Sequence, residues 1–298
     1  MNQIIKELEL QGFRASYISF SRMADIARDY EALVADNPQI EYVKGAARHF
    51  NNYKEPKIEF TPESILVVAA PSEIARVYVN RHGERISVSI PPTYIGDELY
   101  DAMKQAARTA TESRGFHTAP VNGVSHKLLA VRSGLGKYGR NNICYVNGLG
   151  SFVQLRAYYT DVPCDDNFHP MARLDACAKC TLCRKNCPTG IITDAGAIDA
   201  SRCLTMLNEQ KGEFPAWLDP AAHNCLIGCM KCQESCPDNR EHMYFVDTVE
   251  FDEDETGFIL SKFDDEPYPE PIAEKFKAIS NDFYIAVIAR NLRALLRV

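Results

Sequence analysis

The sequence predicts an α+β fold that is followed by a compact cysteine-rich segment and a short helical C-terminus. Helical and strand-like apolar patterns alternate over the first half of the chain. Cysteines then recur at short intervals, and helical spacing returns near the end. With 298 residues, 46% of them hydrophobic, the chain can bury a substantial core. We therefore expect three parts, with the bounds 1–165, 166–245 and 246–298.

The first part should begin with two helices and a buried strand. Gln3–Leu10 has a helical apolar pattern, and Ser21 is expected to cap a second helix whose apolar residues recur at helical spacing. The run Ile65–Ala70 is apolar throughout and ends at Pro71. Such a run predicts a central strand that is covered on both faces.

Further strands and a helix complete this part. Arg76–Asn80 and Arg85–Ile90 alternate β-forming residues around a short turn, which predicts a hairpin. Asp97 is expected to cap another helix. Ile143–Asn147 and Phe152–Tyr159 predict two more strands. These elements together predict helices that flank a largely antiparallel sheet.

The cysteine-rich segment has the spacing of an iron–sulfur protein. Cys177, Cys180, Cys183 and Cys187 precede Pro188 in the pattern C-x2-C-x2-C-x3-C-P, which ligates [4Fe–4S] clusters. A second set repeats the last three positions of this pattern, and a distant cysteine is available as its first member. This second set consists of Cys203, Cys229, Cys232 and Cys236, the last followed by Pro237.

The two sets should exchange their last ligand, because the fourth cysteine of such a motif ligates the other cluster. One cluster is therefore assigned to Cys177, Cys180, Cys183 and Cys236, and the other to Cys203, Cys229, Cys232 and Cys187. Structural zinc is the alternative, since C-x2-C pairs also suit a tetrahedral ion. Eight cysteines with two Cys-Pro endings fit zinc poorly. Cys144, Cys164 and Cys225 remain as free thiols.

Composition and charge limit the classes of protein. No signal segment opens the sequence and no run of about 18 apolar residues is present, so we expect a cytoplasmic protein outside the membrane. The net charge of −7 argues against a broad nucleic-acid surface. Glu250–Glu255 and Asp264–Pro271 predict an exposed connector, and Phe283–Leu296 predicts an amphipathic terminal helix.

A glycine-rich segment is the candidate cofactor site. Gly134, Gly136 and Gly139 lack a Cβ atom, so the backbone there can turn sharply and lie against a large planar cofactor. A corrin and a flavin satisfy this description equally. The alternative is a glycine-rich turn with no ligand.

Several stretches resemble the epoxyqueuosine reductase family. They are His117–Pro120, Ala130–Asn141, Gly150-Ser151, Tyr159–Pro163 and the whole cysteine segment. The resemblance implies a nitroreductase-like, cobalamin-binding domain followed by a ferredoxin-like domain with two [4Fe–4S] clusters. It also implies that electrons pass through the clusters to a cobalt centre that reduces the substrate. The chain lacks an Asp-x-His-x-x-Gly motif, so the cobalamin should be bound base-off. The residues implied as cofactor contacts are Ala119, Pro120, Ser133, Gly134, Leu135, Gly136, Gly139, Arg140, Asn141, Gly150 and Ser151.

The chain departs from the family pattern at three places. His117 stands where the family has its proton-donating aspartate, and an imidazole with a pKa near ~6.5 can act as the general acid at neutral pH. A few extra residues occur around Asn122–Val124, on the substrate side. The chain ends soon after one terminal helix, without the helical-repeat domain often found in family members that act on tRNA. The last departure and the acidic charge argue against tRNA as the substrate.

Three functions are therefore considered. The first is a cobalamin-dependent iron–sulfur reductase of a small or protein-bound substrate, supplied by a low-potential donor of the ferredoxin or flavodoxin type. The second is a true epoxyqueuosine reductase. The third is an electron-transfer protein that serves a corrinoid or other partner protein.

Overall fold

The computed structural model describes residues 1–36, 53, 56–194, 198–263, 267–279 and 284–298. These residues form two compact units. Unit 1 comprises Met1–Pro71, Glu98–Thr181 and Ile192–Asp199. Unit 2 comprises Ser72–Asp97, Leu182–Ile191 and Ala200–Val298. The chain therefore passes several times between the units, and their limits differ from the three consecutive parts expected from the sequence.

Unit 1 is built on an antiparallel sheet with the strand order β1-β2-β8-β5. Its strands are β1 (Arg14–Ser19), β2 (Ser64–Pro71), β8 (Val153–Thr160) and β5 (Thr118–Pro120). The predicted central strand is confirmed, since β2 lies between β1 and β8 and is buried from Ser64 to Ala70. Its unbroken apolar sequence follows from having both faces of the sheet covered.

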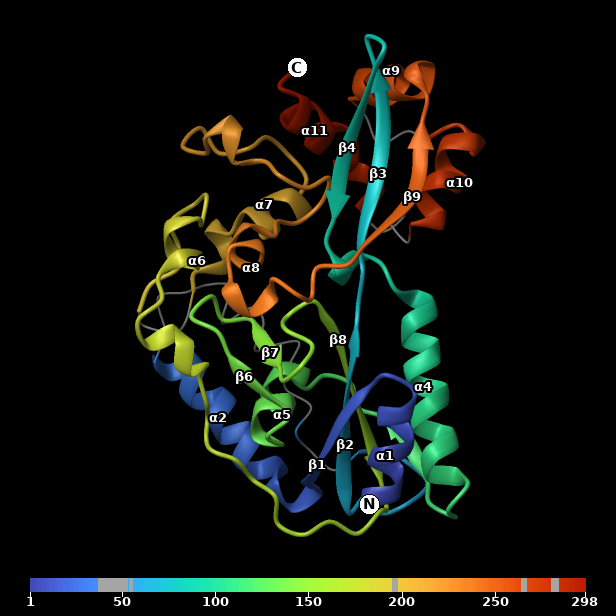
Figure 1. Cartoon of the computed structure of the whole chain (residues 1–298), viewed down its shortest axis with the longest axis vertical. Coiled ribbons are helices and arrows are strands. Elements are labelled where there is room, and N and C mark those ends of the chain that lie inside the picture. The colour runs from blue at the N-terminus through green and yellow to red at the C-terminus, as the bar shows by residue number, and fades with distance from the viewer. Residues whose placement is uncertain (37–52, 54–55, 195–197, 264–266, 280–283) are drawn as a thin grey trace. The chain divides into compact units, whose positions relative to one another are not determined.

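Helices cover the two faces of this sheet (Figure 1). On one face, α1 (Asn2–Leu10) and α4 (Asp97–Glu112) pack against Leu66 and Val68 of β2. On the other face, α2 (Met23–Asp36) and α5 (His126–Arg132) pack against Ile65 and Val67. Alternate residues of one strand thus serve two separate cores.

One predicted detail of unit 1 was wrong, and one predicted strand forms outside the main sheet. Ser21 does not cap the second helix, because it lies inside a 3₁₀ turn, Phe20–Arg22, that leads directly into α2. The strand predicted at Ile143–Asn147 is the short β7 (Cys144–Val146), which pairs with β6 (Gly136–Tyr138) and not within the main sheet. The hairpin β6–β7 therefore contains part of the glycine-rich segment.

Unit 2 contains a separate sheet with the order β4-β3-β9. β3 (Ile74–Arg81) and β4 (Glu84–Ile90) form the predicted hairpin, which turns at His82 and Gly83 with φ angles of 54° and 76°. β9 (Phe245–Phe251) joins β3 in parallel. This long-range pairing explains why residues 72–97 belong with the C-terminal part of the chain.

Three helices close the core of unit 2: α9 (Glu253–Ser261), α10 (Glu270–Ala278) and α11 (Ile285–Leu296). The last confirms the predicted terminal helix. Glu250–Glu255 is not the expected exposed connector, because it ends β9 and begins α9, where Asp252 and Glu255 form a capping box. Within the rest of that predicted connector, residues 264–266 lie outside the described residues.

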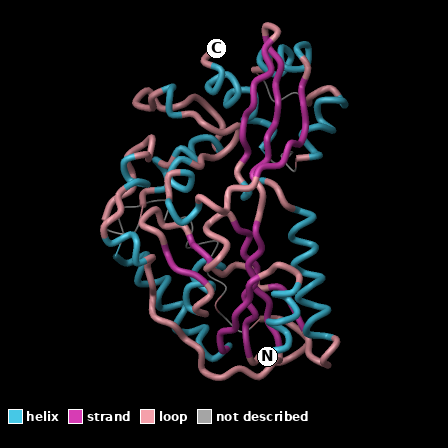
Figure 2. Tube along the Cα trace, viewed as in Figure 1, coloured by secondary structure: helices cyan, strands magenta, loops and turns pink. Residues whose placement is uncertain are grey.

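The cysteine segment consists mostly of loops and very short helices (Figure 2). The helices are α6 (Leu182–Lys185), α7 (Leu204–Glu209) and α8 (Lys231–Glu234). α7 is held by α11, since the buried Asn291 side chain donates to the backbone oxygens of Asn208 and Leu226 at 2.9 and 3.0 Å. Few regular hydrogen bonds hold this segment, so such side-chain contacts matter more than elsewhere.

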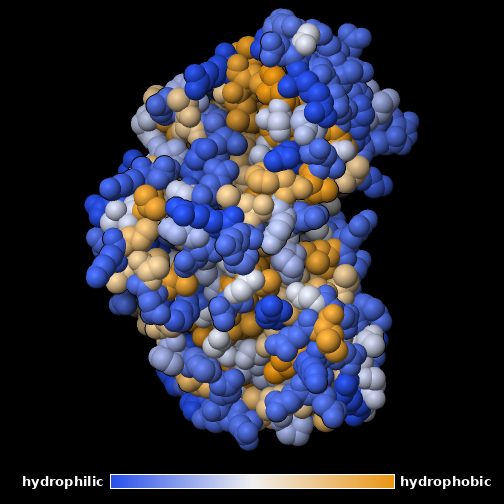
Figure 3. All heavy atoms as spheres, viewed as in Figure 1, coloured by the Kyte–Doolittle hydropathy of each residue, from blue (hydrophilic) through white to orange (hydrophobic). Residues whose placement is uncertain are grey.

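The surface of unit 2 shows hydrophobic atoms gathered over α11 (Figure 3). Partly buried residues of this helix, Leu295 and Leu296, border the core. None of the described helices is long and apolar enough to cross a membrane.

Candidate functional site

None of the eleven cysteines, all of which the structure describes, forms a disulfide. Three of the four ligands predicted for the second cluster lie close together within unit 2. The charge of Cys187 influences both Cys203 and Cys229, and that of Cys203 influences Cys229. Cys232 belongs to α8, which begins two residues after Cys229. This proximity supports the predicted ligand set Cys187, Cys203, Cys229 and Cys232.

Two cysteines of this set, Cys203 and Cys229, have nearby donors that favour the thiolate form. Cys203 is the N-cap residue of α7; burial raises the pKa of its thiol, while backbone N–H groups of Thr205 and Met206 lower it. Burial raises the pKa of Cys229 to about 11, although a hydrogen bond from Asn224 acts to lower it. Asn224 Nδ2 donates to Cys229 Sγ at 3.3 Å. Donors at the start of a helix favour a thiolate, which is the form that binds iron.

Among the described residues, no group of three His, Cys, Asp or Glu side chains converges closely enough to hold one metal ion. A four-iron cube takes one thiolate at each iron and keeps the sulfur atoms farther apart than a single tetrahedral ion does. The donor set, which is entirely cysteine and free of disulfides, fits such a cube.

The first two cysteines of the run lie in unit 1, where Arg140 contacts both. The backbone N–H of Arg140 donates to Cys177 Sγ at 3.4 Å, and its Nε donates to the backbone oxygen of Cys180 at 3.1 Å. A further guanidinium nitrogen donates to the backbone oxygen of Cys177. Arg140 also forms an ion pair with Asp194, and only 11% of its side chain is exposed. Arg140, which the sequence predicted to contact the cofactor, therefore contacts the turn that carries Cys177 and Cys180.

The three glycines of the candidate cofactor segment pack against atoms of the chain itself. A Cβ on Gly134, whose φ is +76°, would lie 2.7 Å from His169 Nε2. On Gly136 it would lie 2.7 Å from Cys144 Sγ and 2.9 Å from the backbone oxygen of Tyr145. A Cβ on Gly139 would meet the Tyr145 ring at 2.5 Å. Internal packing therefore explains these glycines without a cofactor.

Other predicted cofactor contacts are also engaged within unit 1. The backbone oxygen of Ser133 accepts from Ser16 Oγ at 2.7 Å, and Asn141 Nδ2 donates to the Tyr145 hydroxyl at 3.0 Å. Gly150 exchanges backbone hydrogen bonds with Val146. Ser133, Gly136, Gly139, Asn141, Gly150 and Ser151 are buried; Ala119, Leu135 and Arg140 are half-buried; and Pro120 and Gly134 are exposed.

His117 is held in one orientation by a carboxylate. Its Nδ1 lies 2.6 Å from Asp161 Oδ2, and its backbone N–H donates to Asp161 Oδ1 at 2.7 Å. The imidazole also stacks on Phe60 with 5.4 Å between ring centroids. Its side chain is 66% exposed, so His117 is not a core histidine. Asp161 was not among the predicted site residues, although it belongs to the Tyr159–Pro163 stretch that carried the family resemblance.

The protonation of this pair has a defined direction. Burial raises the pKa of Asp161, but two hydrogen bonds from His117 outweigh it and hold that pKa below its ordinary value. Asp161 is therefore a carboxylate at neutral pH and accepts a hydrogen bond from the Nδ1–H group. The second ring nitrogen, Nε2, is then the atom from which His117 can give or take a proton.

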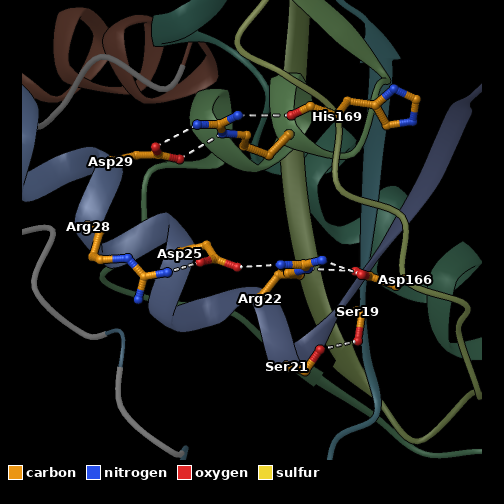
Figure 4. A network of polar contacts seen from close by, with 9 residues as sticks. Ser19, Ser21, Arg22, Asp25, Arg28, Asp29, Asp166 and His169 are labelled. Carbon is orange, nitrogen blue, oxygen red and sulfur yellow. Dashed lines mark hydrogen bonds and ion pairs between the residues drawn. The ribbon is translucent and has the colours of Figure 1, made fainter.

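A polar network fixes the loop that precedes the cysteines (Figure 4). Arg22 of the 3₁₀ turn forms ion pairs with both Asp25 and Asp166. Arg132 pairs with Asp29 at 2.5 Å and also donates to the backbone oxygen of His169 at 3.0 Å. The His169 ring consequently lies over Gly134. Sequence patterns could not identify these partners, since they come from separate segments.

Comparisons with known proteins agree with this description. Residues 176–239 match the model of the 4Fe-4S double cluster binding domain. The chain is 34% identical over 211 residues to the epoxyqueuosine reductase of Bacillus subtilis, covering 64% of this chain and 54% of the relative. It is 36% identical over 118 residues to that of Escherichia coli, covering 39% and 30%. The matches thus span about half or less of these relatives.

Solved structures show the same fold. Epoxyqueuosine reductase from Bacillus subtilis superposes with a TM-score of 0.69 at 20% identity, over 99% of this chain and 80% of that one. The Streptococcus thermophilus enzyme gives 0.68 at 19% identity with the same coverage. An epoxyqueuosine reductase structure with a modified tRNA-Tyr stem loop gives 0.65 at 20% identity, again over 99% and 80%. The predicted α+β fold with a double-cluster domain is confirmed.

Proposed function

We propose that this chain is a member of the epoxyqueuosine reductase family and an iron–sulfur reductase that passes electrons through two [4Fe–4S] clusters to a bound substrate. Its similarity to these reductases and its double-cluster domain support the proposal. The observation that carries the proposal is the grouping of Cys187, Cys203 and Cys229 in unit 2, where Asn224 donates a hydrogen bond to Cys229 Sγ. A low-potential one-electron donor, of the ferredoxin or flavodoxin type, would supply the electrons.

His117 is proposed as the general acid of the reduction. A reduced substrate gains protons as well as electrons, so a proton source is needed near the reacting atoms. Asp161 fixes Nδ1 of the imidazole and leaves Nε2 to donate. The exposed position of His117 keeps this nitrogen accessible.

Cobalamin, bound base-off, is the second cofactor that we propose, and the proposed family membership is its support. A bound cobalamin would supply a cobalt centre as the immediate reductant of the substrate. The glycine-rich segment gives no independent support, because its glycines are explained by internal packing. The role of the chain's own residues there is to hold the Cys177–Cys180 turn through Arg140.

The proposed substrate is a small or protein-bound molecule. The net charge of −7 argues against a broad surface for binding tRNA. Epoxyqueuosine in tRNA is nevertheless the substrate named for the relatives, so it is the first substrate to test.

The first experiment reconstitutes the protein anaerobically and measures iron, sulfide and cobalt after incubation with cobalamin. We expect about eight irons per chain, as two [4Fe–4S] clusters require, together with bound cobalt. The loaded protein is then incubated with dithionite and epoxyqueuosine-containing tRNA, and the nucleosides are analysed. Absence of iron and sulfide would refute the reductase itself, whereas unchanged epoxyqueuosine with both cofactors bound would refute only tRNA as substrate.

One observation favours a second function, namely electron transfer to a partner protein. The internal packing of Gly134, Gly136 and Gly139 means that unit 1 needs no cofactor to explain this segment. Two full clusters without cobalt, combined with rapid reduction of an added corrinoid protein, would establish that second function in place of the first.

A further inference from the structure

Arg140 is a predicted cofactor contact that the structure joins to two predicted cluster ligands. Its backbone N–H donates to the sulfur of Cys177, and its guanidinium donates to the backbone oxygens of Cys177 and Cys180. These three bonds span the C-x2-C turn from one ligand to the next. Because an arginine presents several donors in a rigid planar fork, it can fix such a turn where a flexible ammonium group cannot.

The charge of Arg140 is also placed to act on the cluster. Its side chain is only 11% exposed, so solvent screens the guanidinium weakly. Asp194 is its ion-pair partner, but 67% of the Asp194 side chain is exposed, and water therefore weakens the compensation. A weakly screened cation beside a cluster stabilises the added electron of the reduced state, since hydrogen bonds and charge near the sulfurs set the potential.

We propose that Arg140 holds the turn between Cys177 and Cys180 and raises the reduction potential of the cluster that these cysteines ligate. This role rests on the proposed two-cluster reductase. Arg140 would give the two clusters different reduction potentials. The step concerned is a one-electron reduction of that cluster from the 2+ to the 1+ state, with the electron supplied by the low-potential donor. No proton is transferred, and no covalent bond forms or breaks.

The second cluster provides an internal comparison. Cys229 Sγ receives its side-chain hydrogen bond from Asn224, an uncharged amide, at 3.3 Å. Asn224 also accepts from the backbone N–H of Met230 at 3.2 Å, so its orientation is fixed. One cluster thus has a charged side chain at its ligands and the other a neutral one. The two clusters should differ in potential, with the Cys177–Cys180 cluster the easier to reduce.

The test is a redox titration of the reconstituted full chain, monitored by electron paramagnetic resonance. In Arg140→Met we expect the equilibrium constant for reducing one cluster to fall about tenfold, which is a shift of about 59 mV for one electron. The other cluster should keep its potential. In Asn224→Ala the opposite cluster should shift, and the cluster that responds to Arg140 should not.

Two further variants separate charge from folding. Arg140→Lys keeps the charge but not the fork, so it should retain the parent's potential while binding less iron. Lys137→Met is the matched control, because Lys137 lies on the same segment and pairs with the exposed Asp175, at 3.2 Å. It should leave both potentials unchanged.

The outcomes are distinct. Equal shifts in Arg140→Met and Arg140→Lys would refute the role of charge, and an unchanged potential in Arg140→Met with both clusters present would refute the proposal as a whole. A parent protein that assembles no clusters would instead refute the proposed function.

Discussion

Among single residues, the pair of His117 and Asp161 has the clearest chemical consequence. Its geometry is that of an imidazole whose tautomer is set by a carboxylate, with one nitrogen left for proton transfer. Asp161 acts through His117, so it is a positioning residue, and Phe60 supports the ring from one side.

We expect His117→Asn to lower turnover about 100-fold while iron content stays at the parent value, because general-acid catalysis contributes about 10²–10⁴-fold. Asp161→Asn should reduce turnover less than His117→Asn does, since Asp161 acts only by orienting the imidazole. The measurement is the rate of substrate reduction against pH. Equal turnover in His117→Asn and parent would exclude the acid role.

His126 should make stability depend on pH. Burial lowers the pKa of its half-buried ring, although its two nitrogens lie near the backbone oxygens of Val121 at 3.0 Å and Leu155 at 3.1 Å, which favour the protonated form. A neutral ring donates to only one of these oxygens. The folded state therefore binds fewer protons than the unfolded state below the ordinary value of 6.5. The stabilisation is complete above pH 6.5 and is lost as the pH falls through the lower, folded-state pKa.

The corresponding measurement is thermal unfolding between pH 7.5 and 5.5. The parent should lose stability over this window, and His126→Gln should lose less. His223, whose pKa is lowered by burial and by Arg290, contributes in the same direction, so His223→Gln serves as the comparison. If the stability of His126→Gln depends on pH as steeply as that of the parent, His126 is not the source of the pH dependence.

At the scale of elements, close packing within the β6–β7 hairpin explains why position 136 is a glycine. Gly136 is buried, and any side chain there would be pressed against Cys144 and the backbone of Tyr145. We expect Gly136→Val to destabilise the protein by about 1–3 kcal/mol or more, as overpacking does, and so to reduce soluble yield. Loss of cobalamin binding alone, with unaltered stability, would show that the glycine faces a cofactor.

Gly257 is the matched control for this substitution. It lies inside α9, and a Cβ added there would meet no atom within 4 Å. Gly257→Ala should therefore stabilise the protein by about 0.5–1 kcal/mol, because alanine loses less conformational entropy in a helix. Both variants are compared with the parent by chemical or thermal unfolding.

For the molecule as a whole, the exchange of ligands between the two cysteine motifs is the main prediction. Cys187 ends the first motif but lies near Cys203 and Cys229. Cys187→Ala should therefore damage the cluster of Cys229 and remove about half of the iron, leaving the other cluster intact. Iron and sulfide analysis with electron paramagnetic resonance would detect this, and a loss confined to the Cys177 cluster would reject the exchange.

Cys225→Ala is the control for that experiment. Cys225 is completely buried, its Sγ donates to Asn224 Oδ1 at 3.2 Å, and burial raises the pKa of its thiol well above the ordinary value. It behaves as a small core residue outside both motifs. Iron content should stay near that of the parent.

The sequence by itself determined the elements whose pattern is local. The apolar run of β2, the hairpin of β3 and β4, and the terminal helix α11 follow from side-chain periodicity. The double-cluster domain follows from cysteine spacing, because short intervals between ligands restrict the geometry of the metal group they can share.

Only the tertiary structure decided which distant segments meet. The pairing of β3 with β9, the contact of His117 with Asp161 at a separation of 44 residues, and the contact of Arg140 with Cys177 have no local signal. The same holds for the glycines, whose neighbours are residues such as His169. Local patterns report how a segment curves and which face it buries. Partners are chosen by the burial of apolar surface and the satisfaction of polar groups over the folded chain.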